Sequence, residues 1–248
     1  MKSKQIFFYT IFIISLLLLW QYMAQCSDKV RLLVSSPLLV LDFFKINISK
    51  LLEATFYTFI EAFAGLLIAT TFSFTMMVIC LYVPKLMKYV LPVMVVSQII
   101  PLITLAPLFI ILFGLGIESK IMMATLMCFF PIFVNFSNGI KLISKNIQEL
   151  MFVYNATNLD KIRYMYFPLA LPSIISGLKI ASTLAVIGAI VGEFNGTEIG
   201  IGKNLFIAAK RLEPELMMSS LFLSSLLGGL FYISIVLIEK KFGKWYLK

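Results

Sequence analysis

Long apolar runs separated by short polar segments make up most of this chain. A membrane-spanning helix needs about 20 mostly apolar residues, and six stretches meet that requirement. Their approximate bounds are 6–24, 56–83, 89–113, 121–140, 171–192 and 216–238. Each stretch contains at most one charged residue. The pattern therefore predicts an all-α membrane protein with about six transmembrane helices, organised as a single domain over residues 1–248.

The composition supports a membrane protein and excludes several kinds of enzyme. Of the 248 residues, 60% are hydrophobic and 13% are charged, whereas an average soluble domain has about 45–50% and about 25%. The chain contains no histidine, so neither a Ser-His-Asp triad nor a histidine metal ligand can form. Cys26, Cys80 and Cys128 are far apart, which favours apolar packing over a disulfide framework or metal cluster. We predict no catalytic residue and no metal site.

The first apolar stretch has an alternative interpretation as a cleaved signal peptide. Lys2 and Lys4 precede it, and residues 23–26 faintly resemble a lipoprotein cleavage site. Gln25 is a poor residue before such a site, and the apolar core is longer than that of a typical signal peptide. A retained membrane anchor is therefore favoured.

Lysines and arginines predict the orientation, because cytoplasmic loops carry an excess of them. With the N-terminus inside, the inner segments hold twelve of these residues and the outer segments hold eight. The formal net charge of +9 is spread over short loops, which favours membrane topology over nucleic-acid binding. We expect a multi-pass protein of the cell membrane, inner or cytoplasmic, with both termini in the cytoplasm.

The inner loop, residues 141–170, is the most informative segment. Thr157 and Asp160 have the spacing of a capping box, which predicts a new helix start. Asn155 falls where the preceding short helix should end in a left-handed conformation, which asparagine tolerates best after glycine. A short helix, a tight break and a second short helix therefore form a compact elbow.

The elbow also has an apolar face. Its members are Leu150, Met151, Tyr154, Leu159 and Ile162. Considered alone, such a face equally suits an interfacial helix that lies on the lipid. Pro168 and Pro172 precede the next span, and Pro172 is expected in its first turn.

The elbow resembles the EAA loop of ABC importer permeases, whose pattern is Glu-Ala-Ala, three residues, Gly, nine residues, Ile, one residue and Leu-Pro. The spacing is kept here, although the identities differ. Glu149, Leu150 and Met151 occupy the first three positions, Asn155 the glycine, Met165 the isoleucine and Phe167-Pro168 the Leu-Pro. The resemblance implies that an ATPase is coupled through Glu149, Leu150, Met151, Tyr154, Asn155, Ala156, Leu159, Phe167 and Pro168.

Other segments are similar, in the same order, to the nitrate, sulfonate, taurine and bicarbonate branch of that family. They are residues 35–37, 107–116 with 119–120, 130–131, 177–180, and Glu193 with 200–202. Residues 35–37 also predict a helix start. The similarity extends from about Ser35 to the C-terminus, with one departure at Glu61, where this branch often has arginine.

The resemblance implies a type I ABC importer fold, the MetI-like permease fold, with a cytoplasmic coupling helix. It implies two permease chains, as a homodimer or heterodimer, two ABC ATPase subunits inside, and an extracytoplasmic solute-binding protein outside. The chain contains no Gly-x-x-x-x-Gly-Lys-[Ser/Thr] phosphate loop. We therefore expect that it is not an enzyme and binds no cofactor itself, and that the partner ATPase holds ATP and Mg²⁺.

Polar side chains inside the predicted spans usually face a partner helix or a water-filled path. We expect Glu61 to be hydrogen-bonded or protonated, and Lys179, nearer the inner surface, to extend towards that surface rather than pair with Glu61. Candidates for the translocation path are Gln98, Thr104, Asn135, Ser182 and Thr183. Small hydroxyl residues also serve helix packing, and that alternative stays open. Pro101 and Pro107 should kink the third span, close to the expected gate.

Two other functions stay as alternatives. A secondary transporter driven by an ion gradient predicts inverted repeats with interrupted helices in both halves, and no such repeat is visible in the sequence. An intramembrane enzyme needs a nucleophile, a base or metal ligands at membrane depth, and Glu61 alone is too little. The predicted function is therefore a permease subunit of an ABC importer, which forms a path for a small solute while another chain hydrolyses ATP.

Overall fold

The described part of the chain is built of helices. The structure, a computed structural model, describes residues 35–97, 99–194 and 198–242, with scattered positions between 8 and 24. The elements are α3 Pro37–Ile46, α4 Ile48–Tyr82, α5 Pro84–Ser97, η1 Leu102–Leu105, α6 Ala106–Phe113, α7 Ile117–Lys141, α8 Lys145–Val153, α9 Asn158–Lys161, η2 Ile162–Tyr166, α10 Phe167–Glu193, α11 Ile201–Arg211 and α12 Pro214–Phe242. The predicted all-α class is confirmed.

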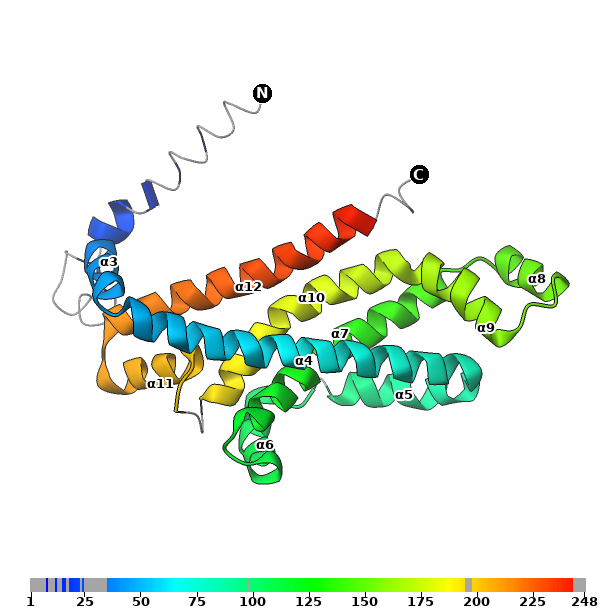
Figure 1. Ribbon diagram of the computed structural model, residues 1–248, viewed down its shortest axis with the longest axis horizontal. Coiled ribbons are helices and arrows are strands. Elements are labelled where there is room, and N and C mark those ends of the chain that lie inside the picture. The colour runs from blue at the N-terminus through cyan, green and yellow to red at the C-terminus, as the bar shows by residue number, and fades with distance from the viewer. Residues whose placement is uncertain are drawn as a thin grey trace.

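Within the described residues, four helical stretches are long and apolar enough to cross a membrane: α4, α7, the continuous stretch Asn158–Glu193 that includes α10, and α12. They run along the long axis of the molecule (Figure 1). α7 packs against both α4 and α10, and α12 packs mainly against α10 and α11. These four correspond to four of the six predicted spans. The predicted span 6–24 lies almost entirely outside the described residues.

The third predicted span, 89–113, is not one continuous helix. α5 ends at Ser97, and the chain resumes as the 3₁₀ turn η1 and the short helix α6, which turns away from α5 in Figure 1. Pro101 and Pro107 explain the break, because proline lacks an amide hydrogen and restricts the residue before it. The predicted kink is thus corrected to a complete interruption. Gln98, at the break, lies outside the described residues.

Glycines let α7 approach its neighbours closely. A Cβ atom at Gly188 of α10 would lie 2.6 Å from the Ala124 Cα, and one at Gly65 of α4 would lie 2.5 Å from the Ala124 Cβ. A Cβ at Gly177 would lie 2.8 Å from the Pro131 carbonyl oxygen. In lipid, helix association depends on such close contact and the dispersion it gives. α7 is therefore the central helix of the bundle.

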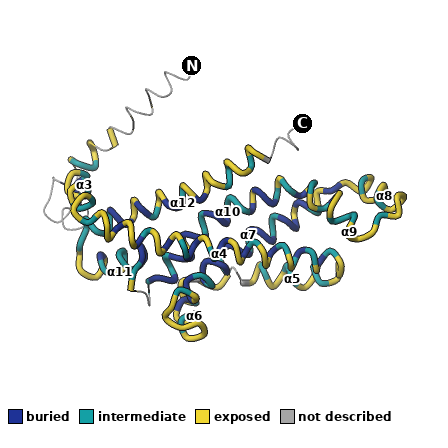
Figure 2. Tube along the Cα trace, viewed as in Figure 1, coloured by how far each residue is buried: buried dark blue, intermediate teal, exposed yellow. Residues whose placement is uncertain are grey.

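Burial follows this arrangement. Figure 2 shows buried residues along α7 and α10, and many exposed residues along α5 and α12. Phe129, Phe133 and Phe136 of α7 belong to the core, and Phe129 packs on Phe72 of α4 with ring centroids 5.0 Å apart. The outward apolar side chains suit contact with lipid or with another transmembrane chain.

The described cysteines serve helix packing, as predicted. Cys80 and Cys128 are buried and free. Cys128 Sγ donates a weak hydrogen bond to the Ala181 carbonyl oxygen at 3.2 Å. Cys26 lies outside the described residues.

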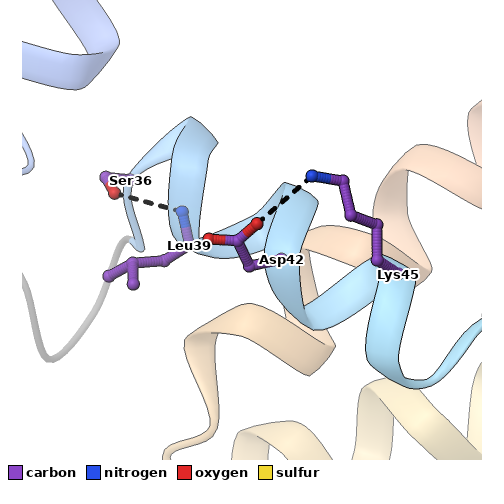
Figure 3. Close-up of polar contacts among 4 residues, drawn as sticks. All are labelled: Ser36, Leu39, Asp42 and Lys45. Carbon is purple, nitrogen blue, oxygen red and sulfur yellow. Dashed lines mark hydrogen bonds and ion pairs between the residues drawn. The ribbon is translucent and has the colours of Figure 1, made fainter.

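α3 begins where residues 35–37 predict a helix start. Ser36 is the N-cap, and its Oγ accepts a hydrogen bond from the Leu39 amide at 3.5 Å (Figure 3). Asp42 and Lys45 form an exposed ion pair on the same helix at 3.4 Å. Exposed pairs contribute little to stability, so the start of α3 is set by its cap and by the proline that follows it.

Candidate coupling and transport site

The predicted elbow is present, and backbone hydrogen bonds close its turn. α8 ends at Val153, and Asn155 has a φ of 49°. The Asn155 amide donates to the Phe152 carbonyl oxygen at 2.9 Å, and the Ala156 amide donates to that of Met151 at 3.0 Å. This pair of bonds is a Schellman motif, which satisfies free carbonyls at a helix end. The left-handed conformation predicted for Asn155 is confirmed.

A capping box starts the second arm of the elbow. Thr157 Oγ1 accepts a hydrogen bond from the Asp160 amide at 3.2 Å, and Asp160 Oδ2 accepts one from the Thr157 amide at 3.0 Å. The predicted capping box is therefore confirmed. Because the Schellman motif and the capping box are adjacent, the turn is fixed from both sides.

The second arm runs directly into a membrane helix. α9, the π turn η2 and α10 form one continuous helical stretch. Pro168 lies in the first turn of α10, whereas Pro172 lies inside the helix, so the prediction that Pro172 occupies the first turn is wrong. The wider π turn accommodates the missing amide of Pro168, and the helix continues past both prolines.

Apolar side chains of the elbow point away from the bundle. Leu150, Phe152, Val153, Tyr154 and Leu159 are each between 51% and 77% exposed, and we call these five the elbow surface. The Schellman turn at Asn155 and the capping box at Thr157 fix the backbone that carries these side chains. The elbow therefore keeps the five side chains exposed. In water such a set of side chains favours a partner that covers it.

The predicted coupling residues divide between exposed and half-buried positions. Leu150, Tyr154 and Leu159 lie on the elbow surface, Glu149 and Asn155 are exposed beside it, and Met151, Ala156 and Pro168 are half-buried. The prediction missed Phe152 and Val153, because a single helical face does not include them. The uninterrupted apolar run 150–154 was the signal that marks them.

Phe167 has a different position from the other predicted coupling residues. Its ring lies 5.9 Å from that of Phe74 of α4, measured between centroids. Met165, two residues earlier, is almost fully buried. The end of the EAA-like segment therefore anchors the elbow on the bundle, while its first half is exposed.

Lys179 has a partner that the sequence did not indicate. Its Nζ lies 2.6 Å from Glu239 Oε2, so an ion pair joins α10 to the last turns of α12. The pair is compatible with the expectation that Lys179 extends towards the inner surface, because Glu239 follows directly on the predicted last span, at its inner end. Glu61 does not take part in this pair, in agreement with the predicted separation of Glu61 and Lys179.

Glu61 belongs to a second polar cluster at the other end of the bundle. It is buried on α4, and it interacts electrostatically with Glu193 of α10 and Lys120 of α7. Thr58 Oγ1, one turn earlier on α4, donates to Glu193 Oε1 at 2.6 Å. The prediction for Glu61 omitted these partners, since Lys120 and Glu193 lie at helix ends and resemble loop residues in the sequence.

The structure separates the predicted path residues. Ser182 is fully buried in the bundle, Asn135 is half-buried, and Thr104 is exposed in η1. Thr183 lines an open groove of about 320 Å³ between α10 and α12. The other lining residues are Val186, Ile187, Ile190, Ser224, Ser225, Gly228 and Gly229. Of the described candidates, Thr183 is the one placed on this groove.

The hydroxyl groups of the groove all donate hydrogen bonds to backbone carbonyl oxygens of their own helices. Ser224 and Ser225 donate to the Leu221 carbonyl oxygen at 2.8 and 2.9 Å, and Thr183 donates to that of Ile180 at 2.9 Å. Each hydroxyl hydrogen is thereby used within its own helix. The oxygen lone pairs are left as acceptors, so the groove suits a solute that donates hydrogen bonds.

A bundle of long apolar helices, with a capped apolar elbow at one end, is typical of an integral membrane protein. The chain belongs to the family described as binding-protein-dependent transport system inner membrane component, whose model matches residues 81–244. It is therefore a permease subunit of an ABC transporter for a small solute. The ion-driven secondary transporter is not supported.

Relatives that are similar over most of the chain carry permease names. The chain is 31% identical to the formylaminopyrimidine transport permease protein ThiX of Halalkalibacterium halodurans over 98% of both chains. It is 30% identical to the riboflavin transport system permease protein RibX of Chloroflexus aurantiacus over 93% of this chain and 87% of the relative. It is 31% identical to the putative aliphatic sulfonates transport permease protein SsuC of Escherichia coli over 59% of this chain and 56% of the relative. The last similarity agrees with the predicted branch.

Proposed function

We propose that this chain is one of two permease chains of an importer, and that its elbow inserts into a cytoplasmic ATPase subunit that binds ATP and Mg²⁺. The observation that carries the proposal is the elbow surface, five exposed apolar side chains on a backbone fixed by a Schellman motif and a capping box. An interfacial helix on lipid does not need such a fixed turn. Insertion into a protein cleft does benefit from a fixed turn, because a preorganised elbow loses less conformational entropy on binding.

The proposal also assigns the two ends of the bundle. α8 and α9 lie at one end and α3 and α11 at the other (Figure 1). The elbow end faces the cytoplasm, both termini are cytoplasmic, and the α11 end receives an extracytoplasmic solute-binding protein. A second permease chain covers part of the outward apolar faces and completes the path.

Cysteine labelling tests both the orientation and the docking. In a cysteine-free background, we expect Asn204→Cys on α11 to react with an impermeant thiol reagent added to intact cells. Asn146→Cys on α8 should react only after the cells are opened. In inside-out vesicles, Tyr154→Cys should be labelled when the chain is alone and protected when its ATPase is bound, because the elbow surface is then covered.

Lys85→Cys provides the matched control for protection. Lys85 is exposed at the turn between α4 and α5, at the same end of the bundle, and its labelling should not depend on the ATPase. Reaction of Asn146→Cys from outside would overturn the orientation. Equal labelling of Tyr154→Cys with and without bound ATPase would contradict docking at the elbow.

We further propose that the transported solute is a small uncharged nitrogen heterocycle. Two relatives that match nearly the whole chain are named for formylaminopyrimidine and riboflavin, whereas the sulfonate relative matches 59% of the chain. The groove supports the same class, because its hydroxyl oxygens are free to accept and its described lining residues are uncharged. A ring amino group donates hydrogen bonds, whereas a sulfonate only accepts them.

Uptake measurements test this substrate class. In cells carrying the complete transporter, unlabelled formylaminopyrimidine should compete with its labelled form, and an aliphatic sulfonate should not. Thr183→Val and Ser225→Ala should each slow uptake several-fold, as expected for the loss of one hydrogen bond of about 1 kcal/mol. Ser234→Ala is the control, since Ser234 is exposed on α12 and is not among the groove residues. Competition by the sulfonate alone would contradict the proposal.

A further inference from the structure

The N-terminus of α11 is capped by side chains of two other helices. α11 begins after Gly200, which has a φ of 152° and supplies no side-chain cap. The Ile201 amide donates to Thr58 Oγ1 of α4 at 3.0 Å, and the Gly202 amide donates to Glu193 Oε2 of α10 at 2.5 Å. The free amides of a helix start are thus satisfied by the bundle itself.

Two glycines make this contact possible. A Cβ atom at Gly200 would lie 2.4 Å from the carboxyl carbon of Glu193, and one at Gly202 would lie within 2.3 Å of the Ile190 carbonyl oxygen. Glu193 Oε1 accepts the hydrogen bond from Thr58 described above, and both side chains are almost fully buried. One carboxyl group therefore joins α4, α10 and α11.

Lys120 adds a fourth helix to this joint. Its side chain is 1% exposed, and its Nζ donates to the carbonyl oxygens of Leu115 and Gly116 in the turn before α7. The same ammonium interacts electrostatically with Glu61 and Glu193. A buried acid is costly unless a compensating charge and hydrogen bonds surround it. Glu193 accepts hydrogen bonds from Thr58 and Gly202, and it shares the charge of Lys120 with Glu61.

The joint lies at one end of the longest continuous helix. The stretch Asn158–Glu193 contains 36 residues, which corresponds to a helix of about 54 Å at 1.5 Å per residue. Glu193 is its last residue, and the elbow turn precedes its first. A force on α11 therefore reaches the elbow through one bonded joint and one helix.

We propose that Glu193 and Thr58 are positioning residues that couple α11 rigidly to α10, so that docking of the solute-binding protein on the α11 end changes the position of the elbow. This inference rests on the proposed function, which places the binding protein and the ATPase at opposite ends. Without the two caps, α11 keeps its packing against α10 and α12, but its first turn is no longer bonded to Glu193 and Thr58. A displacement of α11 is then passed to α10 less completely, through side-chain packing alone.

ATPase assays on the complete transporter, reconstituted in lipid with its ATPase and binding protein, test the inference. Glu193→Gln and Thr58→Val should keep the basal ATPase rate and lose about tenfold in stimulation by the loaded binding protein, the effect of about 1.4 kcal/mol. Thr58→Ser, which keeps the hydroxyl, should restore stimulation. Glu53→Gln is the control, because Glu53 is an exposed acid on α4 near Thr58.

Each outcome has a separate meaning. Full stimulation in Glu193→Gln and Thr58→Val overturns the inference. A parallel fall of basal and stimulated rates also overturns it, because it indicates a purely structural role. If Glu193→Gln does not assemble, the Thr58→Val and Thr58→Ser pair still decides. Absence of stimulation in the wild-type complex contradicts the proposed function instead.

Discussion

Ala156→Asp is expected to abolish uptake while the membrane helices still insert. The Ala156 amide closes the Schellman turn on the Met151 carbonyl oxygen, and its side chain is half-buried beside the elbow surface. A carboxylate there becomes an unpaired charge when the ATPase covers the elbow, a change of about 2 kcal/mol or more for a central interface position. Affinity for the ATPase should fall roughly 30-fold or more. Co-purification of the ATPase and uptake in the same cells measure both effects.

Asn155→Gly is the matched control at the neighbouring position. Asn155 has a φ of 49°, and glycine adopts this conformation at least as easily. We therefore expect near-normal ATPase binding and uptake from Asn155→Gly. Normal uptake in Ala156→Asp would mean that the elbow is an interfacial helix and that coupling occurs elsewhere.

Gly188→Leu should strongly destabilise the folded state of the single chain. A Cβ atom at Gly188 would already lie 2.6 Å from the Cα of Ala124 and 3.1 Å from its amide nitrogen, so the α7 backbone has to move. Overpacking of this kind typically costs about 1–3 kcal/mol, and here it acts on the central helix pair. The yield of monodisperse protein in detergent and its resistance to protease should both fall sharply.

Gly228→Leu is the control for side-chain size alone. No heavy atom lies within 4 Å of a Cβ built at Gly228, which is on α12 facing the groove. The same enlargement should therefore leave the yield and protease resistance of the single chain unchanged. Equal loss in both variants would contradict the close packing of α7 and α10.

Local signals in the sequence predicted the features that depend on neighbouring residues. Asn155 and the Thr157–Asp160 pair determine the elbow through backbone hydrogen bonds within a few residues, so the pattern alone was sufficient. The apolar runs likewise predicted α4, α7, α10 and α12, because helix formation in lipid depends on length and polarity.

Features that depend on distant residues could not be predicted in the same way. The Lys179–Glu239 pair and the Glu193–Thr58 bond join positions that only the packing of the bundle brings together. The break at Pro101 was expected as a kink, because proline permits either a bent helix or an interruption and the neighbouring contacts decide between them. The sequence of a single chain does not show which distant residues come into contact.

The ion pair between Lys179 and Glu239 also bears on how the protein is made. Lys179 leaves the ribosome 60 residues before Glu239, as the difference 239 − 179 gives, so α10 enters the membrane before its acidic partner exists. A lysine at the centre of a membrane helix costs about 2.5–3.5 kcal/mol, and one nearer the surface, such as Lys179, costs less. The ion pair between α10 and α12 therefore forms only after the last turns of α12 have been made, so a chain truncated before Glu239 should pack α12 less firmly on α10.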